Sequence, residues 1–114
     1  MDDYSVIIQK AKELSELINS HEITVKYRES LAKLQNDVQS QRLLAELVQL
    51  GREVSESMNS PEADRPYGPA EIEMLKKELD ANQFLKDHLV IQRQYLDLIS
   101  QVQKRIKDPS IRQD

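Results

Sequence analysis

The chain has 114 residues, 39% of them hydrophobic and 32% charged, with a formal net charge of −4 at pH 7. It contains no cysteine, which excludes disulfides, thiolate nucleophiles and cysteine-ligated zinc or iron–sulfur sites within the chain. The acidic balance argues against strong binding to nucleic acid. With only 2 Gly, 4 Pro and 4% aromatic residues, the composition is typical of an all-α protein.

The first predicted helix covers residues 3–19. Its apolar residues step by four, three and four positions and therefore share one helical face: Ile7, Ala11, Leu14 and Ile18. Ser20 follows, and Glu22 would lie in the first turn of a new helix. The pattern predicts a short corner, with Ser20 as the N-cap of the next helix.

The second predicted helix covers residues 21–58, a stretch without Pro and with a single Gly, Gly51. It carries two apolar series at helical spacing, the first being Tyr27, Leu31, Leu34 and Val38, the second Leu43, Leu47, Leu50 and Val54. The two series lie on different sides of the helix. A helix that is apolar on several sides needs burial on more than one of them.

Residues 59–68 break every helical period and include two prolines, so they are predicted to form a loop. The third helix then runs over residues 69–107, with Pro69 at its first position and its end before Asp108 and Pro109. It carries two adjacent apolar seams at coiled-coil spacing. Residues 108–114 are expected to form a flexible tail.

These elements predict an all-α fold with three helices, one short and two long, in an elongated antiparallel bundle that forms a single domain over residues 1–107. The wide apolar stripes exceed what one such bundle covers, so we expect a homodimer. The alternative is a monomeric three-helix bundle in which the long helices break.

The sequence offers no recognisable catalytic or cofactor site. His21 and His88 are far apart and lack the Glu spacing of helical di-iron sites. No serine lies in a nucleophile elbow, and two glycines cannot build a phosphate loop. No apolar run exceeds three residues, so no membrane span or signal peptide is expected. We therefore expect a cytoplasmic, non-enzymatic protein that binds no cofactor or metal and does not contact membranes.

Function would then come from burial of an apolar helical surface against a partner. The candidate interface residues are apolar and lie on the two long predicted helices: Leu43, Leu47, Leu50, Phe84, Ile91, Tyr95 and Leu98. Aromatic and branched side chains beside polar neighbours are typical of interface centres. The alternative is that these residues pack the intramolecular or dimer core.

The order of helix, corner, long helix, loop and long helix resembles the YlbF/YmcA family of small bacterial regulators. The resemblance is carried by Ala11 to Leu14 with Ile18, by Ser20 to Glu22 with Tyr27 and Arg28, by the stretches 31–37 and 76–82, and by 95–99. In the stretch 76–82, Leu79 and Asn82 follow the loop that contains Pro and Gly. Together these segments span about residues 4–107.

This resemblance implies an all-α fold that dimerises and a regulatory rather than catalytic role. Similar proteins form a complex that influences competence, sporulation and biofilm formation, associated with ribonuclease Y and the processing of selected transcripts. The implied partners are family paralogues and a ribonuclease. Some members carry a cysteine-bearing tail implicated in iron–sulfur binding, and this sequence has no cysteine. The alternative function is a structural or chaperone-like helical module without a role in RNA turnover.

Overall fold

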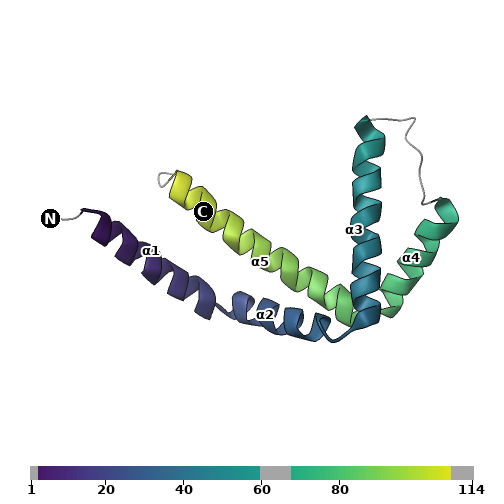
Figure 1. Cartoon of the computed structure of the whole chain (residues 1–114), viewed down its shortest axis with the longest axis horizontal. Coiled ribbons are helices and arrows are strands. Elements are labelled where there is room, and N and C mark those ends of the chain that lie inside the picture. The colour runs from purple at the N-terminus through teal and green to yellow at the C-terminus, as the bar shows by residue number, and fades with distance from the viewer. Residues whose placement is uncertain (1–2, 60–67, 109–114) are drawn as a thin grey trace, which may run out of the picture. The chain divides into compact units, whose positions relative to one another are not determined.

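The computed structural model of the chain describes residues 3–59 and 68–108. Within them the chain forms five helices and no strand, which confirms the all-α class (Figure 1). The helices are α1 (Asp3–Ser20), α2 (Glu22–Leu34), α3 (Val38–Asn59), α4 (Pro69–Ala81) and α5 (Gln83–Lys107). The prediction of three helices was therefore wrong in number, since each long predicted helix is divided in two.

The second predicted helix is interrupted at Asp37, which lies between α2 and α3. The Asp37 carboxylate accepts a hydrogen bond from the backbone N–H of Ser40 at 3.0 Å, and this N–H belongs to the third residue of α3. This hydrogen bond holds the pKa of Asp37 below its ordinary value, since it stabilises the ionised form. Asp37 is thus an N-cap, a local signal that ends one helix and begins another without any Pro or Gly.

The third predicted helix is interrupted in the same way at Asn82, between α4 and α5. The side-chain oxygen of Asn82 accepts a hydrogen bond of 2.9 Å from the backbone N–H of Leu85, the third residue of α5. The backbone N–H of Asn82 itself donates to the carbonyl of Leu79 at the end of α4. Asn82 therefore closes α4 and caps α5.

The corner between α1 and α2 lies where the sequence predicts it, but its cap is a different residue. Ser20 is the last residue of α1, and its hydroxyl donates to the carbonyl of Leu17 at 3.3 Å. The ring atom Nδ1 of His21 instead accepts from the backbone N–H of Ile23 at 3.1 Å. The imidazole acts as the acceptor because it presents a lone pair to the first turn of α2, as a serine oxygen would.

Other predicted boundaries agree closely with the structure. Helix α1 begins at Asp3 and extends one residue beyond the predicted end, α4 begins at Pro69, and α5 ends at Lys107. Most of the predicted loop, residues 60–67, and most of the predicted tail, residues 109–114, lie outside the described residues.

The described residues group into two compact units, which we describe separately. Unit 1 contains residues 3–31 and 90–108, and unit 2 contains residues 32–59 and 68–89. The boundaries fall within α2 and α5, so both helices contribute residues to each unit.

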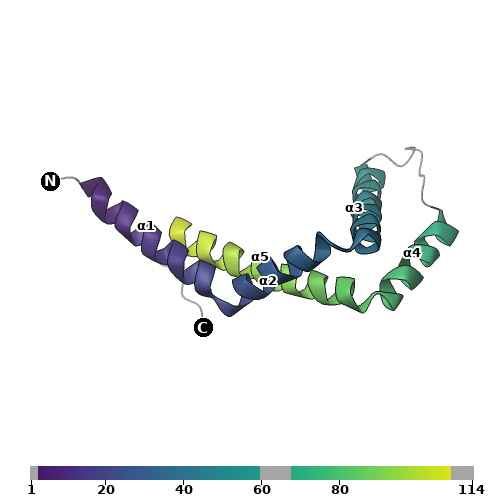
Figure 2. The same ribbon diagram turned by 60° about the horizontal axis from the view of Figure 1, so that its bottom comes forward.

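Unit 2 has a small apolar core between α3, α4 and the first turns of α5. Leu43, Leu75 and Leu85 form it and are no more than 5% exposed. The side chains packed around this cluster are all partly buried leucines: Leu44, Leu47, Leu50, Leu79 and Leu89. Helices α3 and α4 lie side by side, as Figures 1 and 2 both show, so the leucines of one helix meet those of the other.

Unit 1 consists of α1 and most of α2 alongside the C-terminal part of α5 (Figures 1 and 2). Tyr27 of α2 and Tyr95 of α5 stack there, with ring centroids 4.5 Å apart and ring planes 17° apart. Its buried side chains among the described residues are the small polar Thr24 and Ser30, which are 4% and 6% exposed. No apolar side chain described in unit 1 reaches the burial of the unit 2 leucines.

Candidate interaction surfaces

The two cap residues of unit 2 meet at one buried serine. The amide Nδ2 of Asn82 donates a hydrogen bond of 2.9 Å to the hydroxyl oxygen of Ser40, which has no exposed surface. Ser40 also supplies the N–H that Asp37 caps. A chain of hydrogen bonds therefore runs from Asp37 through Ser40 and Asn82 to Leu85, joining the N-terminal ends of α3 and α5. This polar junction fixes the start of both helices.

A polar hollow of about 380 Å³ lies beside this junction, but its charged side chains already have partners. The guanidinium of Arg42 contacts the carboxylate of Glu78 at 2.6 Å and that of Glu46 at 2.9 Å. Both carboxylates raise the pKa of Arg42, with the hydrogen bond to Glu78 the larger cause. The pairs are exposed, so each contributes little to stability. The charged side chains that line the hollow are therefore already engaged within the protein.

His88 lies within unit 2 and is only 1% exposed. It packs near Phe84, one turn earlier on α5, with ring centroids 6.2 Å apart. Burial lowers the pKa of His88, because the charged imidazolium loses its hydration. Its place in the packed interior makes it a structural residue of unit 2. No group of three or more metal-ligating side chains occurs within residues 3–59 and 68–108.

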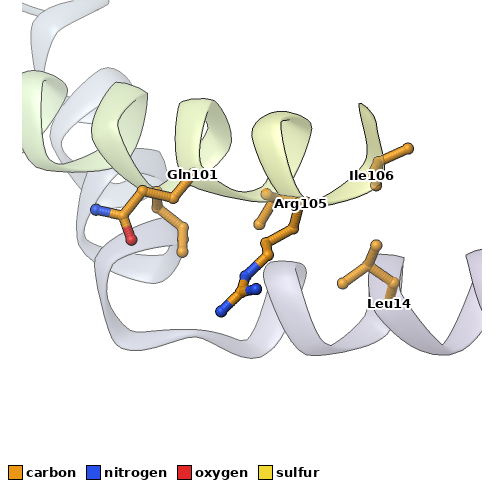
Figure 3. Close-up of a pocket in the computed structure, with 6 residues that line it drawn as sticks. Leu14, Gln101, Arg105 and Ile106 are labelled. Carbon is orange, nitrogen blue, oxygen red and sulfur yellow. The ribbon is translucent and has the colours of Figure 1, made fainter. Parts of the chain in front are cut away.

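Unit 1 contains an open, mainly apolar groove of about 350 Å³ between α1 and the end of α5 (Figure 3). It is lined by Leu14, Leu98, Gln101, Val102, Arg105 and Ile106. Figure 3 shows Leu14 and Ile106 facing each other across it, while Arg105 extends from α5 toward α1. Among the described residues, Arg105 forms no ion pair or side-chain hydrogen bond. The groove thus combines an apolar floor with a free guanidinium at its edge.

The first turns of α1 continue past this groove and beyond the end of α5, as Figures 1 and 2 show. Ile7 lies seven residues before Leu14 and therefore on the same helical face. Leu14 is partly buried beside α5, whereas Ile7 is 64% exposed. Tyr4 and Ile8 on the same turns are exposed to a similar degree. We call residues 4–11 the α1 overhang.

The candidate interface residues of the second predicted helix lie in or against the core of unit 2. Leu43 is 2% exposed, and Leu47 and Leu50 pack against the core cluster. The structure brings these three together, but Leu43 offers no free surface in the described chain. Leu47 and Leu50 are only partly buried, and the role of the three residues as an interface stays a prediction.

The candidates from the third predicted helix are all half-buried and are divided between the units. Phe84 belongs to unit 2, beside His88. Ile91, Tyr95 and Leu98 share one face of α5 in unit 1, where Tyr95 stacks on Tyr27 and Leu98 lines the groove.

Sequence reasoning did not single out Ile7, Arg105 and Ile106 as site residues. The four-three-four spacing in the first helix placed Ile7 and Leu14 on one face. It could not show where α5 ends relative to them.

Unit 1 of this helical protein has exposed apolar surface. A comparison with known families identifies the family to which the chain belongs. The family model for "Control of competence regulator ComK, YlbF/YmcA" matches residues 7–109. The chain belongs to the YlbF/YmcA family. The family description is that of a regulator. The YlbF/YmcA match includes both cap residues, Asp37 and Asn82, and the whole unit 1 groove.

No curated protein and no solved structure matches the chain. None of the helices within the described residues is long and apolar enough to cross a membrane.

Proposed function

We propose that this protein is a non-catalytic regulatory adaptor in the cytoplasm, and that it holds a bacterial protein complex together by helix-on-helix contacts. The observation that carries the proposal is the exposed apolar surface of unit 1. Nine large apolar side chains there are exposed: Tyr4, Val6, Ile7, Ile8, Leu17, Val25, Val90, Leu96 and Ile106. Exposed apolar surface of this extent marks interaction sites in soluble proteins.

The process in which the adaptor acts is proposed from its family. A regulatory role agrees with the description of the YlbF/YmcA family. The resemblance further implies paralogues and a ribonuclease as partners and the processing of selected transcripts as the output. We propose that output for this protein, with a structural helical module as the alternative.

Leu96 is the residue through which the partner contact can be tested. It is 57% exposed on α5 and lies about 200° around the helix from Leu98, on the side opposite the groove. Leu96→Glu should therefore leave the packing of unit 1 in place while it introduces a charge into an apolar contact. Val38→Glu is the matched control, since Val38 is 76% exposed on α3 in unit 2.

The experiment replaces the gene in its native host by a deletion, by tagged wild type or by either tagged variant. We expect deletion to change transcript ends and half-lives, and wild type and Val38→Glu to restore them. Wild type should co-purify with a ribonuclease and with family paralogues, and Leu96→Glu should lose them. Unchanged transcripts after deletion, together with no ribonuclease or relative in the wild-type eluate, would leave the structural module as the better description.

A further inference from the structure

Helix α3 carries a second apolar stripe on the face opposite the core of unit 2. Leu43, Leu47 and Leu50 pack in or against that core. Since successive residues of a helix are about 100° apart, Ala45 and Val48 point away from it. Val48 is 51% exposed. A helix that is apolar on two sides needs burial on both, and the core of unit 2 buries only one side of α3.

The second stripe lines an open groove of about 470 Å³ within unit 2. At one end, Nε2 of Gln41 donates a hydrogen bond of 2.8 Å to the carbonyl of Leu34, which joins α3 to the end of α2. From Gln41 to Arg52 at the other end, α3 advances about 16 Å, or three helical turns. A path of this length fits a helical segment. We call this site the α3 groove, and its apolar side chains are Leu34, Leu44, Ala45 and Val48.

Arg52 gives the α3 groove a positive charge at one end. Within residues 3–59 and 68–108 its guanidinium forms no ion pair and no side-chain hydrogen bond. None of the described side chains that line the groove is a carboxylate. Pairing of this face with the same face of a second copy would therefore bring an unpaired guanidinium into an apolar contact, which is unfavourable. A partner that supplies a carboxylate avoids this penalty and adds a charge-assisted hydrogen bond.

We propose that the α3 groove binds an amphipathic helix of another protein, and that this helix carries a Glu or Asp that pairs with Arg52. The apolar residues of the partner helix recur at helical spacing and pack on the floor of the groove, and its largest side chain lies over the small Ala45. The inference rests on the proposed function in treating the protein as an adaptor. It gives the adaptor a binding surface in unit 2, separate from the contact through Leu96 in unit 1.

The first test uses two fluorescent synthetic helical peptides as probes of the purified full chain. Both have leucines at four-three-four spacing, and the polar positions beside the leucines are glutamate in one peptide and lysine in the other. Fluorescence anisotropy should show that the glutamate peptide binds about tenfold more tightly, because only it can pair with Arg52. Arg52→Gln should remove this preference. Equal binding of the two peptides to wild type, or no binding of either, overturns the proposal.

Val48 and Val54 provide a matched pair of variants on one helix. They are 51% and 53% exposed, and they lie about 120° apart around α3. Val48→Glu should weaken binding of the glutamate peptide about tenfold or more, since it places a charge on the apolar floor. Val54→Glu should bind the peptide as wild type does, and circular dichroism should show that both variants keep their helices. Weaker binding by Val54→Glu and not by Val48→Glu would contradict the location of the site.

The second test identifies the partner in the native host. A photoreactive residue in place of Gln49, which lines the α3 groove, should cross-link to another protein. Mass spectrometry should locate the cross-link in a helix with apolar residues at helical spacing and a carboxylate beside them. Replacing that carboxylate by lysine should abolish binding to wild type, and Arg52→Glu should restore it. A cross-link to a second copy of the chain, or a charge exchange without restored binding, overturns the proposal.

Failure of the α3 groove can be told apart from failure of the adaptor role in RNA processing. Peptide binding by the purified chain does not depend on whether deletion changes transcripts. Leu96→Glu lies in unit 1 and should bind the glutamate peptide as wild type does. Conversely, changed transcripts after deletion, together with equal binding of the two peptides, would support the adaptor role and reject the α3 groove.

Discussion

Single polar residues decide where the helices of this protein begin. Asp37, His21 and Asn82 each place a side-chain acceptor against the free N–H groups of a first turn. Such groups have no partner inside the helix, so an acceptor at this position favours a new start over continuation. Asn82 is the most connected of the three, because its amide also donates to the buried hydroxyl of Ser40.

Asn82→Ala should lower the free energy of unfolding by about 1–2 kcal/mol, since it removes the cap of α5 and the donor to Ser40. Asn82→Asp is the control, because it keeps an oxygen acceptor for the N–H of Leu85. Urea denaturation should rank wild type above Asn82→Asp, and Asn82→Asp above Asn82→Ala. Equal stability of wild type and Asn82→Ala would show that the polar junction contributes nothing.

His88 should make the protein less stable in mild acid. Burial lowers its pKa in the folded chain, so the unfolded chain takes up a proton at higher pH than the folded one. The stabilisation is complete above the unfolded-state pKa of about 6.5 and is lost as the pH falls below it, by about 1.4 kcal/mol per pKa unit of difference.

Thermal unfolding of wild type and His88→Leu at pH 7.5 and pH 5.5 tests this effect. We expect the midpoint of wild type to fall between these pH values by several degrees more than that of His88→Leu. A decrease of the same size in both proteins would assign the acid sensitivity to other groups.

At the scale of the element, α5 has a different environment at each of its two ends. Its first turns lie in the core of unit 2, where Leu85 has no exposed surface. Its later turns lie in unit 1, where Leu96 and Ile106 are more than half exposed. The same amphipathic pattern along α5 therefore packs into a core at the N-terminal end of the helix and forms exposed surface at the C-terminal end.

Leu85→Ala should lower the free energy of unfolding by about 2–5 kcal/mol, since it removes buried apolar contacts and leaves a cavity. Leu96→Ala is the same chemical change on the same helix at an exposed position. It should change the free energy by about 0.5 kcal/mol or less. Guanidinium denaturation of both variants measures the difference, and equal losses would show that Leu96 is buried in solution.

At the scale of the whole molecule, the two units differ in how much apolar surface they bury. Unit 2 contains every buried leucine among the described residues: Leu34, Leu43, Leu75 and Leu85. Unit 1 is ordered by half-buried contacts such as the stacked pair Tyr27 and Tyr95. Since local stability follows the number of buried apolar contacts, unit 1 should open more readily than unit 2.

Amide hydrogen exchange read by mass spectrometry should show this difference directly. In dilute protein, amides of α1 should exchange faster than those of α3 around Leu43. Equal protection of both helices would contradict the distinction between the units.

The sequence by itself determined the all-α class, the corner near Ser20, the start of α4 at Pro69 and the end of α5 at Lys107. These features depend on local chemistry: helical spacing, breakers and terminal signals act within a few residues. The breaks at Asp37 and Asn82 were also local in origin. They were missed because a polar residue between two apolar series is equally compatible with one continuous helix. The second cap also binds Ser40, 42 residues earlier, a contact that the order of residues does not reveal.

Only the tertiary structure decided which apolar residues are core and which are surface. Leu43 and Leu96 both belong to regular apolar stripes, yet one is 2% exposed and the other 57%. Periodicity gives the direction in which a side chain points from its own helix, whereas burial depends on whether another helix lies in that direction. For the α1 overhang, the neighbouring α5 ends too early to cover Ile7. That difference in helix length leaves the apolar side chains of the α1 overhang exposed.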